Sequence, residues 1–155
     1  MTTIAFRDGV MASDSGSWSG DASHGWARKV AQGPDGTLYG TAGNAAECGE
    51  FLNWVDGGCV GERPKPETTN VEKNESSFIV LIARPGARIG LLTAKGEERY
   101  DAPYYAIGIG APVAFGALFM GATAEQAIEA AKEHGAGAFG RVQSMRHPQK
   151  LRAVE

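Results

Sequence analysis

The second residue of the chain, Thr2, could act as a nucleophile that carries its own base. Removal of Met1 would leave the Thr2 hydroxyl and a free α-amine on one residue. A threonine hydroxyl is a weak nucleophile, but an α-amine with a pKa of roughly 7.7 to 8.0 can accept its proton near neutral pH, usually through a water molecule. This is the N-terminal-threonine form of nucleophile-plus-base chemistry. Many chains begin with Met-Thr, so the same residues also fit the plain start of a strand.

Composition limits the classes of function. The 155 residues suit one domain with a real core, and a formal net charge of -3 gives no electrostatic reason to expect nucleic acid as a partner. There is no apolar run that could span a bilayer and no signal-peptide core, so we expect a cytoplasmic protein without a membrane partner. We expect a single domain over 1–146 and a C-terminal tail over 147–155. The basic residues around this boundary, Arg146, Lys150 and Arg152, fit a solvated chain end better than a binding patch.

The two cysteines, Cys48 and Cys59, are predicted to be reduced and half-buried. The chain shows no secretory signal, and disulfides are rare in reducing compartments. Neither cysteine has the CxxC or Cys-His spacing of a metal site. We therefore expect no metal and no other cofactor.

Hydrophobic periodicity and turn signals predict three helices and a series of short strands. The stretch from Asp14 to Trp26 is rich in Ser and Gly yet carries two tryptophans, which favours an ordered loop. Residues 59–75 hold two prolines and several charges, which favours an exposed connection. Helices are expected from an Asn44 N-cap to Gly57, over 111–120 and over 124–134, and strands at 2–6, 10–13, 29–32, 37–42, 77–83, 88–94, 104–109 and 139–146.

The order of these elements predicts an α+β fold in which two sheets are sandwiched between helical layers. The segment 111–120 is almost wholly apolar, so a helix there must be covered on most of its surface. Thr123 and Gln126 stand at the capping-box positions of the next helix.

Four segments form a wider pattern that covers almost the whole chain. They are Thr2 to Ala5, Gly9 to Ser15, Thr41 to Glu47, and Ala106 to Ala111 leading into the apolar helix and the helix that follows it. In this order and at these spacings they resemble a proteasome β-type subunit of the N-terminal-nucleophile hydrolase superfamily. In size, the chain is most similar to the peptidases of bacterial two-component proteases and to short prophage-encoded proteasome-like proteins. The resemblance implies a four-layer αββα sandwich.

The resemblance also implies roles for individual residues. Thr2 becomes the nucleophile, Asp14 the carboxylate beside it, and Lys29 a buried cation that lowers the pKa of the threonine oxygen and stabilises the developing alkoxide. Gly43 takes the position whose backbone N-H binds the oxyanion. Read without the resemblance, Asp14 opens a turn, Lys29 is a solvated strand residue, and Gly43 turns a strand into a helix. Glu47 fits a first-turn helix charge better than a catalytic group.

Two positions depart from the family pattern. The family has Ser-Gly where this chain has Ile109-Gly110, and isoleucine cannot make the hydrogen bonds of that serine near the α-amine and the catalytic water. The family also has an aspartate, followed shortly by a serine, where this chain has Gly135 and Ala138. The adjacent His134 could supply some acid-base capacity, although pairing with the C-terminal dipole of its helix explains it better.

Two functions follow from the resemblance. The first is a threonine-type hydrolase that cleaves peptide or amide bonds, with peptide or protein substrates, a homo-oligomeric ring or multimer, and an ATP-driven unfoldase as a conceivable partner. The second is a catalytically silent subunit with a structural or assembly role. The tryptophans Trp18, Trp26 and Trp54 fit subunit contacts in either case, and they also fit core packing within one chain. A small-molecule binding module has no motif in its favour.

Overall fold

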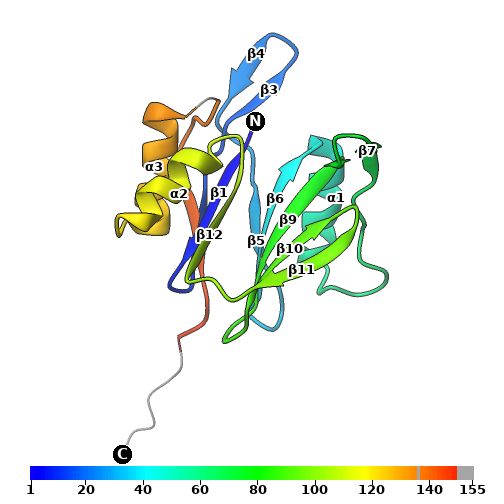
Figure 1. Ribbon diagram of the computed structural model, residues 1–155. Helices are drawn as coiled ribbons and strands as arrows, with labels where there is room; N and C mark the ends of the chain where they lie inside the picture. The colour runs from blue at the N-terminus through cyan, green and yellow to red at the C-terminus, as the bar shows by residue number, and fades with distance from the viewer. Residues whose placement is uncertain (136, 150–155) are drawn as a thin grey trace, which may run out of the picture.

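The computed structural model describes residues 1–135 and 137–149, and Figure 1 shows their arrangement. The helices are α1 (Ala45–Asp56), α2 (Ala111–Phe119) and α3 (Ala124–His134). The strands are β1 (Thr3–Arg7), β2 (Val10–Ser13), β3 (Ser17–Ser19), β4 (Ala22–His24), β5 (Val30–Gln32), β6 (Leu38–Gly43), β7 (Thr68–Asn70), β8 (Glu75–Ser76), β9 (Phe78–Ala83), β10 (Ile89–Thr93), β11 (Gly96–Tyr100), β12 (Tyr104–Gly108) and β13 (Gln143–Arg146).

The first sheet has four antiparallel strands in the order β12-β1-β2-β13. The register between β1 and β12 places Thr3 opposite Gly108, so the N-terminus lies beside the turn that leads into α2. Helices α2 and α3 cover the outer face of this sheet (Figure 1). Small side chains such as Ala5 and Ala12 let the helices approach closely, and Leu118 and Ile128 fill the layer between them.

The second sheet has five antiparallel strands in the order β11-β10-β9-β6-β5, with α1 on its outer face. The six residues of β9, Phe-Ile-Val-Leu-Ile-Ala, are apolar on both faces because one face packs against α1 and the other against the first sheet. Between the two sheets lies an apolar core that includes Ile4, Met11 and Leu81. Each such buried side chain contributes about 1.5–3 kcal/mol to folding.

The layers therefore run helices, sheet, sheet, helix, which confirms the predicted α+β four-layer αββα sandwich. The capping signals also proved correct. Asn44 Oδ1 accepts a hydrogen bond from the Glu47 N-H at the start of α1, and Thr123 and Gln126 form the full capping box of α3.

Several short polar strands were not predicted. The stretch from Asp14 to Trp26 contains the hairpin β3–β4, which turns at Gly20 with a φ of 61°. The connection over 59–75 contains the hairpin β7–β8, and the exposed edge strand β11 follows β10. The last strand is also shorter than the predicted 139–146, because pairing with β2 begins only at Gln143. These strands are held by pairing with a neighbour and lack the buried periodicity that identifies strands in a sequence.

The segment after β13 contacts both sheets at His147. Its N-H donates to Gly9 O at 2.7 Å, and its ring Nε2 lies 2.7 Å from Ala83 O. The expected solvated tail thus begins with a docked residue. Lys150 and Arg152, assigned to that tail, lie outside the described residues.

In the part of the chain that the structure describes, no helix is both long and apolar enough to cross a membrane.

Candidate active site

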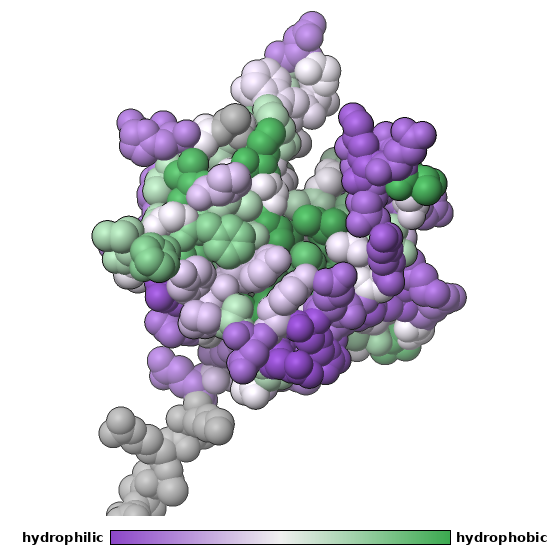
Figure 2. All heavy atoms as spheres, in the orientation of Figure 1, coloured by the Kyte–Doolittle hydropathy of each residue, from purple (hydrophilic) through white to green (hydrophobic). Residues whose placement is uncertain are grey.

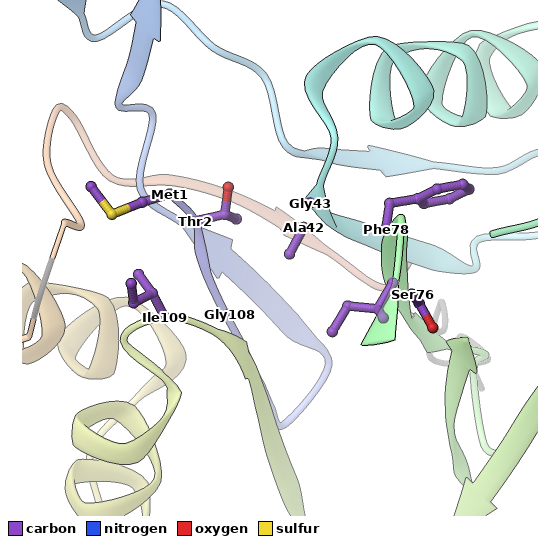
Figure 3. A pocket seen from close by; sticks show the side chains of 9 residues that line it. Met1, Thr2, Ala42, Gly43, Ser76, Phe78, Gly108 and Ile109 are labelled. Atoms are coloured by element: carbon purple, nitrogen blue, oxygen red, sulfur yellow. The ribbon is translucent and has the colours of Figure 1, made fainter. Parts of the chain in front are cut away.

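Thr2 lies directly before the first residue of β1. Its carbonyl oxygen accepts a hydrogen bond from the Ile109 N-H at 2.8 Å, which fixes the backbone of residue 2 to the end of β12. Figure 3 shows Thr2 with Met1 and Ile109 on one side and Ala42 and Gly43 on the other. Thr2 is half-buried and lines two cavities.

The neighbouring Thr3 has a different surrounding. It is fully buried, its N-H donates to Asp14 Oδ1 at 3.0 Å, and its hydroxyl oxygen accepts from the Gly110 N-H at 3.0 Å. Both polar groups of Thr3 are therefore used in internal hydrogen bonds, and Thr2 is the threonine that lines the cavities.

Asp14 follows directly after β2 and is fully buried. Its Oδ2 atom accepts a hydrogen bond from Lys29 Nζ at 2.9 Å and weaker ones from the Gly16 and Phe139 N-H groups at 3.3 Å. A buried carboxylate is tolerated only when it is paired and hydrogen-bonded, and this one has both kinds of contact.

Lys29 precedes β5, and its side chain is only 7% exposed. Its Nζ donates to Asp14 Oδ2 at 2.9 Å and to the Met1 carbonyl oxygen at 3.1 Å. Burial lowers the pKa of this lysine, while the attraction of Asp14 opposes the shift. The structure therefore brings Asp14, Lys29 and the Met1-Thr2 amide together, and the reading of Lys29 as a solvated strand residue is wrong.

Gly43 ends β6 and immediately precedes the N-cap of α1. Its φ is 129°, and a Cβ atom there would lie 2.6 Å from Phe78 Cα and 2.7 Å from Ser77 O. Only glycine fits this backbone. The positive end of the α1 dipole begins beside it, which favours negative charge near this position.

Glu47, in the first turn of α1, accepts a hydrogen bond from the Ser77 hydroxyl at 2.6 Å. This contact ties α1 to the segment ahead of β9 and agrees with a structural role for the residue.

Two positions singled out in the sequence, 109 and 135, carry no polar side chain. The Ile109 side chain is 46% exposed. At Gly135, a Cβ atom would lie 2.5 Å from Ala131 O, so this backbone accepts no side chain, and hence no carboxylate, at that position. His134 ends α3 in an exposed position. The positions 109 and 135 therefore supply no polar side chain to the site.

Two cavities meet at Thr2. The larger, of about 360 Å³, lies between the end of β12 and the paired strands β6 and β9, and the smaller, of about 160 Å³, lies toward Lys29. Thr41 and Cys48 line the smaller cavity and were not assigned to the site from the sequence. Cys48 is one helical turn beyond Asn44, so its place on α1 was predictable, but its proximity to Lys29 depends on how α1 packs on the sheet. Burial raises the pKa of its thiol, and both cysteines are free.

Within residues 1–135 and 137–149, the structure contains no cluster of three or more His, Cys, Asp or Glu side chains that could hold a metal ion.

Two antiparallel sheets between helical layers form the fold of proteasome-like proteins, and this chain has that fold. Among solved structures it is similar to BPH from Thiobacillus denitrificans in complex with epoxomicin, with a TM-score of 0.66, 22% identity, and coverage of 96% of this chain and 99% of that chain. A second structure of BPH from Thiobacillus denitrificans is similar with a TM-score of 0.65 and 21% identity, and it covers 96% of this chain and 99% of that chain.

Eukaryotic HslV from Trypanosoma brucei is similar with a TM-score of 0.60 and 16% identity, covering 94% of this chain and 99% of that one. At these identities the likeness concerns the fold. No protein-family model and no curated protein sequence matches the chain.

Proposed function

We propose that this protein is a threonine-type N-terminal-nucleophile hydrolase that cleaves peptide or amide bonds once Met1 has been removed. The observation that carries the proposal is the position of the Lys29 ammonium. It is buried against Asp14 and lies 3.1 Å from the carbonyl oxygen of the amide that joins Met1 to Thr2. Burying a charge is costly even when the charge is paired, so the placement of Lys29 beside the candidate nucleophile supports a chemical role.

In the proposed reaction, Thr2 Oγ1 attacks the carbonyl carbon of the substrate while its proton passes to the α-amine of the same residue. The C–N bond of the substrate then breaks, the leaving amine takes that proton, and an ester joins the acyl group to Thr2. A water molecule attacks the ester, again with the α-amine as base. The products are a carboxylic acid and the restored hydroxyl.

Lys29 has the electrostatic role in this scheme. An ammonium near Thr2 favours the developing negative charge on its oxygen, and its position is maintained by the 2.9 Å contact with Asp14. Asp14 also receives the Thr3 N-H, so the same carboxylate fixes both the lysine and the backbone that follows the nucleophile. Asp14 is thus a positioning residue.

Gly43 has the oxyanion role in the proposal. The N-H of residue 43 and the N-terminal end of α1 offer positive partial charges on the side of Thr2 where a substrate carbonyl would develop negative charge. The absence of a Cβ atom lets the substrate approach the main chain.

A silent subunit with a structural or assembly role is the second candidate. Ile109 and Gly135 favour it, because they replace the polar groups that would support the α-amine and the catalytic water. Trp26 is 85% exposed and Phe119 is 75% exposed, as expected of a chain that buries apolar surface in a homo-oligomer. A homo-oligomer, with or without an ATP-driven unfoldase, fits both candidates.

The two candidates are separated by the chemical state and reactivity of residue 2. We would measure the intact mass of the protein and treat it with epoxomicin, the compound named in the BPH complex. A second form, released from a fusion cleaved directly before Thr2, supplies the free α-amine whether or not cells remove Met1.

The hydrolase proposal predicts one covalent adduct, mapped to Thr2 by peptide mass spectrometry. Thr2→Ala should abolish labelling and lower turnover of peptide substrates by about 10³-fold or more. Thr69→Ala, at an exposed threonine, is the matched control. If the form with a free Thr2 α-amine neither labels nor cleaves, the silent candidate replaces the hydrolase.

A further inference from the structure

The larger of the two cavities at Thr2 is lined by apolar side chains and by two hydroxyl groups, those of Thr2 and Ser76. None of its lining residues has an ionisable side chain. They are Met1, Thr2, Ala42, Gly43, Ser76, Phe78, Ile79, Gly108 and Ile109. Figure 2 shows an apolar hollow in the middle of this face of the molecule, with hydrophilic residues to its right and below it.

The inner wall comes from the second sheet. Ala42 on β6 and Ile79 on β9 are directly opposite each other in the strand register. Side chains alternate along a strand, so while Phe78 packs toward α1, Ile79 faces the space between the sheets and packs partly against the central core. Because Ala42 and Ile79 are held opposite each other by the strand pairing of β6 with β9, they form a fixed surface for a ligand side chain.

The outer wall is Ile109. Its N-H donates to Thr2 O at 2.8 Å, and the following Gly110 N-H donates to Thr3 Oγ1 at 3.0 Å. These two bonds attach the wall to the candidate nucleophile. The Ile109 side chain remains 46% exposed, although isoleucine is among the residues most often buried. Exposed apolar surface beside a reactive group, in a hollow of about 360 Å³, is typical of a ligand pocket.

The smaller cavity differs in chemistry and size. Its volume is about 160 Å³, and its lining includes three ionisable side chains, those of Arg28, Lys29 and Cys48. Both cavities share Met1, Thr2 and Gly43, so a chain bound at Thr2 with its carbonyl toward Gly43 presents side chains to both.

We propose that Ile109 is a specificity-determining residue, and that the larger cavity binds an apolar side chain of leucine or phenylalanine size next to the bond being cleaved. The inference rests on the hydrolase function proposed above, and it names the substrate class of that site. Of the two residues that flank the scissile bond, one is large and apolar and the other is small. The Ile109 side chain offers no hydrogen bond and provides apolar contact for the substrate.

The test uses the form with a free Thr2 α-amine and a set of internally quenched peptides. Each of the two residues that flank the scissile bond is varied in turn among Ala, Leu, Phe and Asp. At one of them we expect kcat/KM to be at least 10-fold higher for Leu or Phe than for Ala, and lowest for Asp, because a cavity of this kind discriminates by about 10–200-fold for small apolar differences.

Two substitutions test the assignment to Ile109. Ile109→Ser should lower the preference for Leu or Phe at least fivefold, and Ile109→Phe, which fills the hollow, should shift the preference to Ala. Val60→Ser, at a side chain that is 78% exposed and outside both cavities, is the matched control. Circular dichroism checks that each variant is folded.

The outcomes distinguish the two proposals. If Thr2 is labelled and peptides are cleaved, but no preference depends on residue 109, the specificity inference is overturned and the hydrolase stands. If nothing is labelled or cleaved, the hydrolase proposal is wrong. Calorimetric binding of the same peptides to the Thr2→Ala variant then tests whether the larger cavity binds an apolar side chain. Tighter binding of the Leu and Phe peptides that Ile109→Ser reduces supports the assignment, whereas equal binding of all peptides overturns it.

Discussion

Two groups of ionised side chains in this protein differ in burial and in the number of their partners. At the candidate active site, one carboxylate, Asp14, meets one lysine, and both side chains are almost completely buried. On the outer edge of the second sheet, the Glu97 carboxylate receives three arginines, Arg63, Arg84 and Arg99, at 3.1, 2.7 and 3.1 Å, and these arginines are 34%, 27% and 51% exposed.

The difference appears in the direction of the pKa shifts. Hydrogen bonds, first from Arg84, lower the pKa of Glu97 to about 2, so the charged form is favoured in the folded protein. At Lys29, desolvation by burial is the largest effect and lowers the pKa, so the charged form is disfavoured. The edge cluster supplies stability, whereas the buried pair holds a charge where the surrounding protein opposes it. Ionisable groups with shifted pKa values cluster at functional sites, and this supports the proposed role of Lys29.

The largest effect should follow from removing the site charge. We expect Lys29→Ala to lower turnover of peptide substrates by at least about 10²-fold, as for the loss of one electrostatic stabiliser in other enzymes, without unfolding the protein. It leaves Asp14 buried with backbone donors only, so the free energy of unfolding should also fall, by up to about 3–5 kcal/mol.

Steady-state kinetics and urea unfolding measure both quantities, and Lys65→Ala, at an exposed lysine, is the control. A double variant, Asp14→Asn with Lys29→Met, removes both charges and should recover part of the stability but none of the turnover. Unchanged turnover in folded Lys29→Ala protein would show that the lysine assignment is wrong.

The edge cluster should show the reverse pattern. A carboxylate whose pKa is lowered on folding contributes stability above its unfolded pKa, and that contribution is lost as the pH falls toward the folded value of about 2. We therefore expect Glu97→Gln to lower the free energy of unfolding by about 1–3 kcal/mol at pH 7 and to flatten its decline between about pH 5 and pH 2. Turnover at pH 7 should not change.

Urea unfolding at pH 7 and pH 3 tests this expectation, with Glu72→Gln, at an exposed position, as the control. Equal stability of the variant and the parent at pH 7 would mean that the cluster contributes nothing, and the comparison between the two groups would fail.

The smallest effect should come from breaking the surface ion pair between Arg28 and Asp56. Arg28 pairs with Asp56 in a bidentate contact at the surface, where the two side chains are 45% and 48% exposed. Hydrogen bonding to Arg28 lowers the pKa of Asp56, but exposed pairs contribute only about 0.2–1 kcal/mol. Asp56→Asn should therefore change the free energy of unfolding by less than about 1 kcal/mol, and less still in 0.5 M salt. A larger loss of unfolding free energy would show that the exposed Arg28–Asp56 pair contributes as much as the buried Lys29–Asp14 pair.

The elements that local chemistry specifies were predictable. Asn44 and the Thr123-Gln126 pair mark helix starts because a side chain satisfies a backbone N-H within three residues, and that contact needs nothing distant. The apolar run Phe78 to Ala83 marks a strand buried on both faces. Short strands such as β3 and β11 were missed because their stability comes from a paired neighbour.

The candidate site shows the same division. Thr2, Asp14, Lys29 and Gly43 come from four separate segments, and their assignment from sequence rested on resemblance to a family. Their individual residue types would equally suit a turn, a strand end and a helix start. Their catalytic roles remain a proposal.

The sequence by itself determined the residue types at the site, including the isoleucine and glycine where polar groups would be expected, and the helix caps that rely on neighbours in the chain. Only the tertiary structure decided that Lys29 is buried against Asp14 and near the Met1 carbonyl, that Gly135 accepts no side chain, and that Ile109 forms a wall of a cavity. The physical reason is that burial, pKa and cavity shape depend on atoms brought together from distant segments, and a linear pattern does not contain those distances.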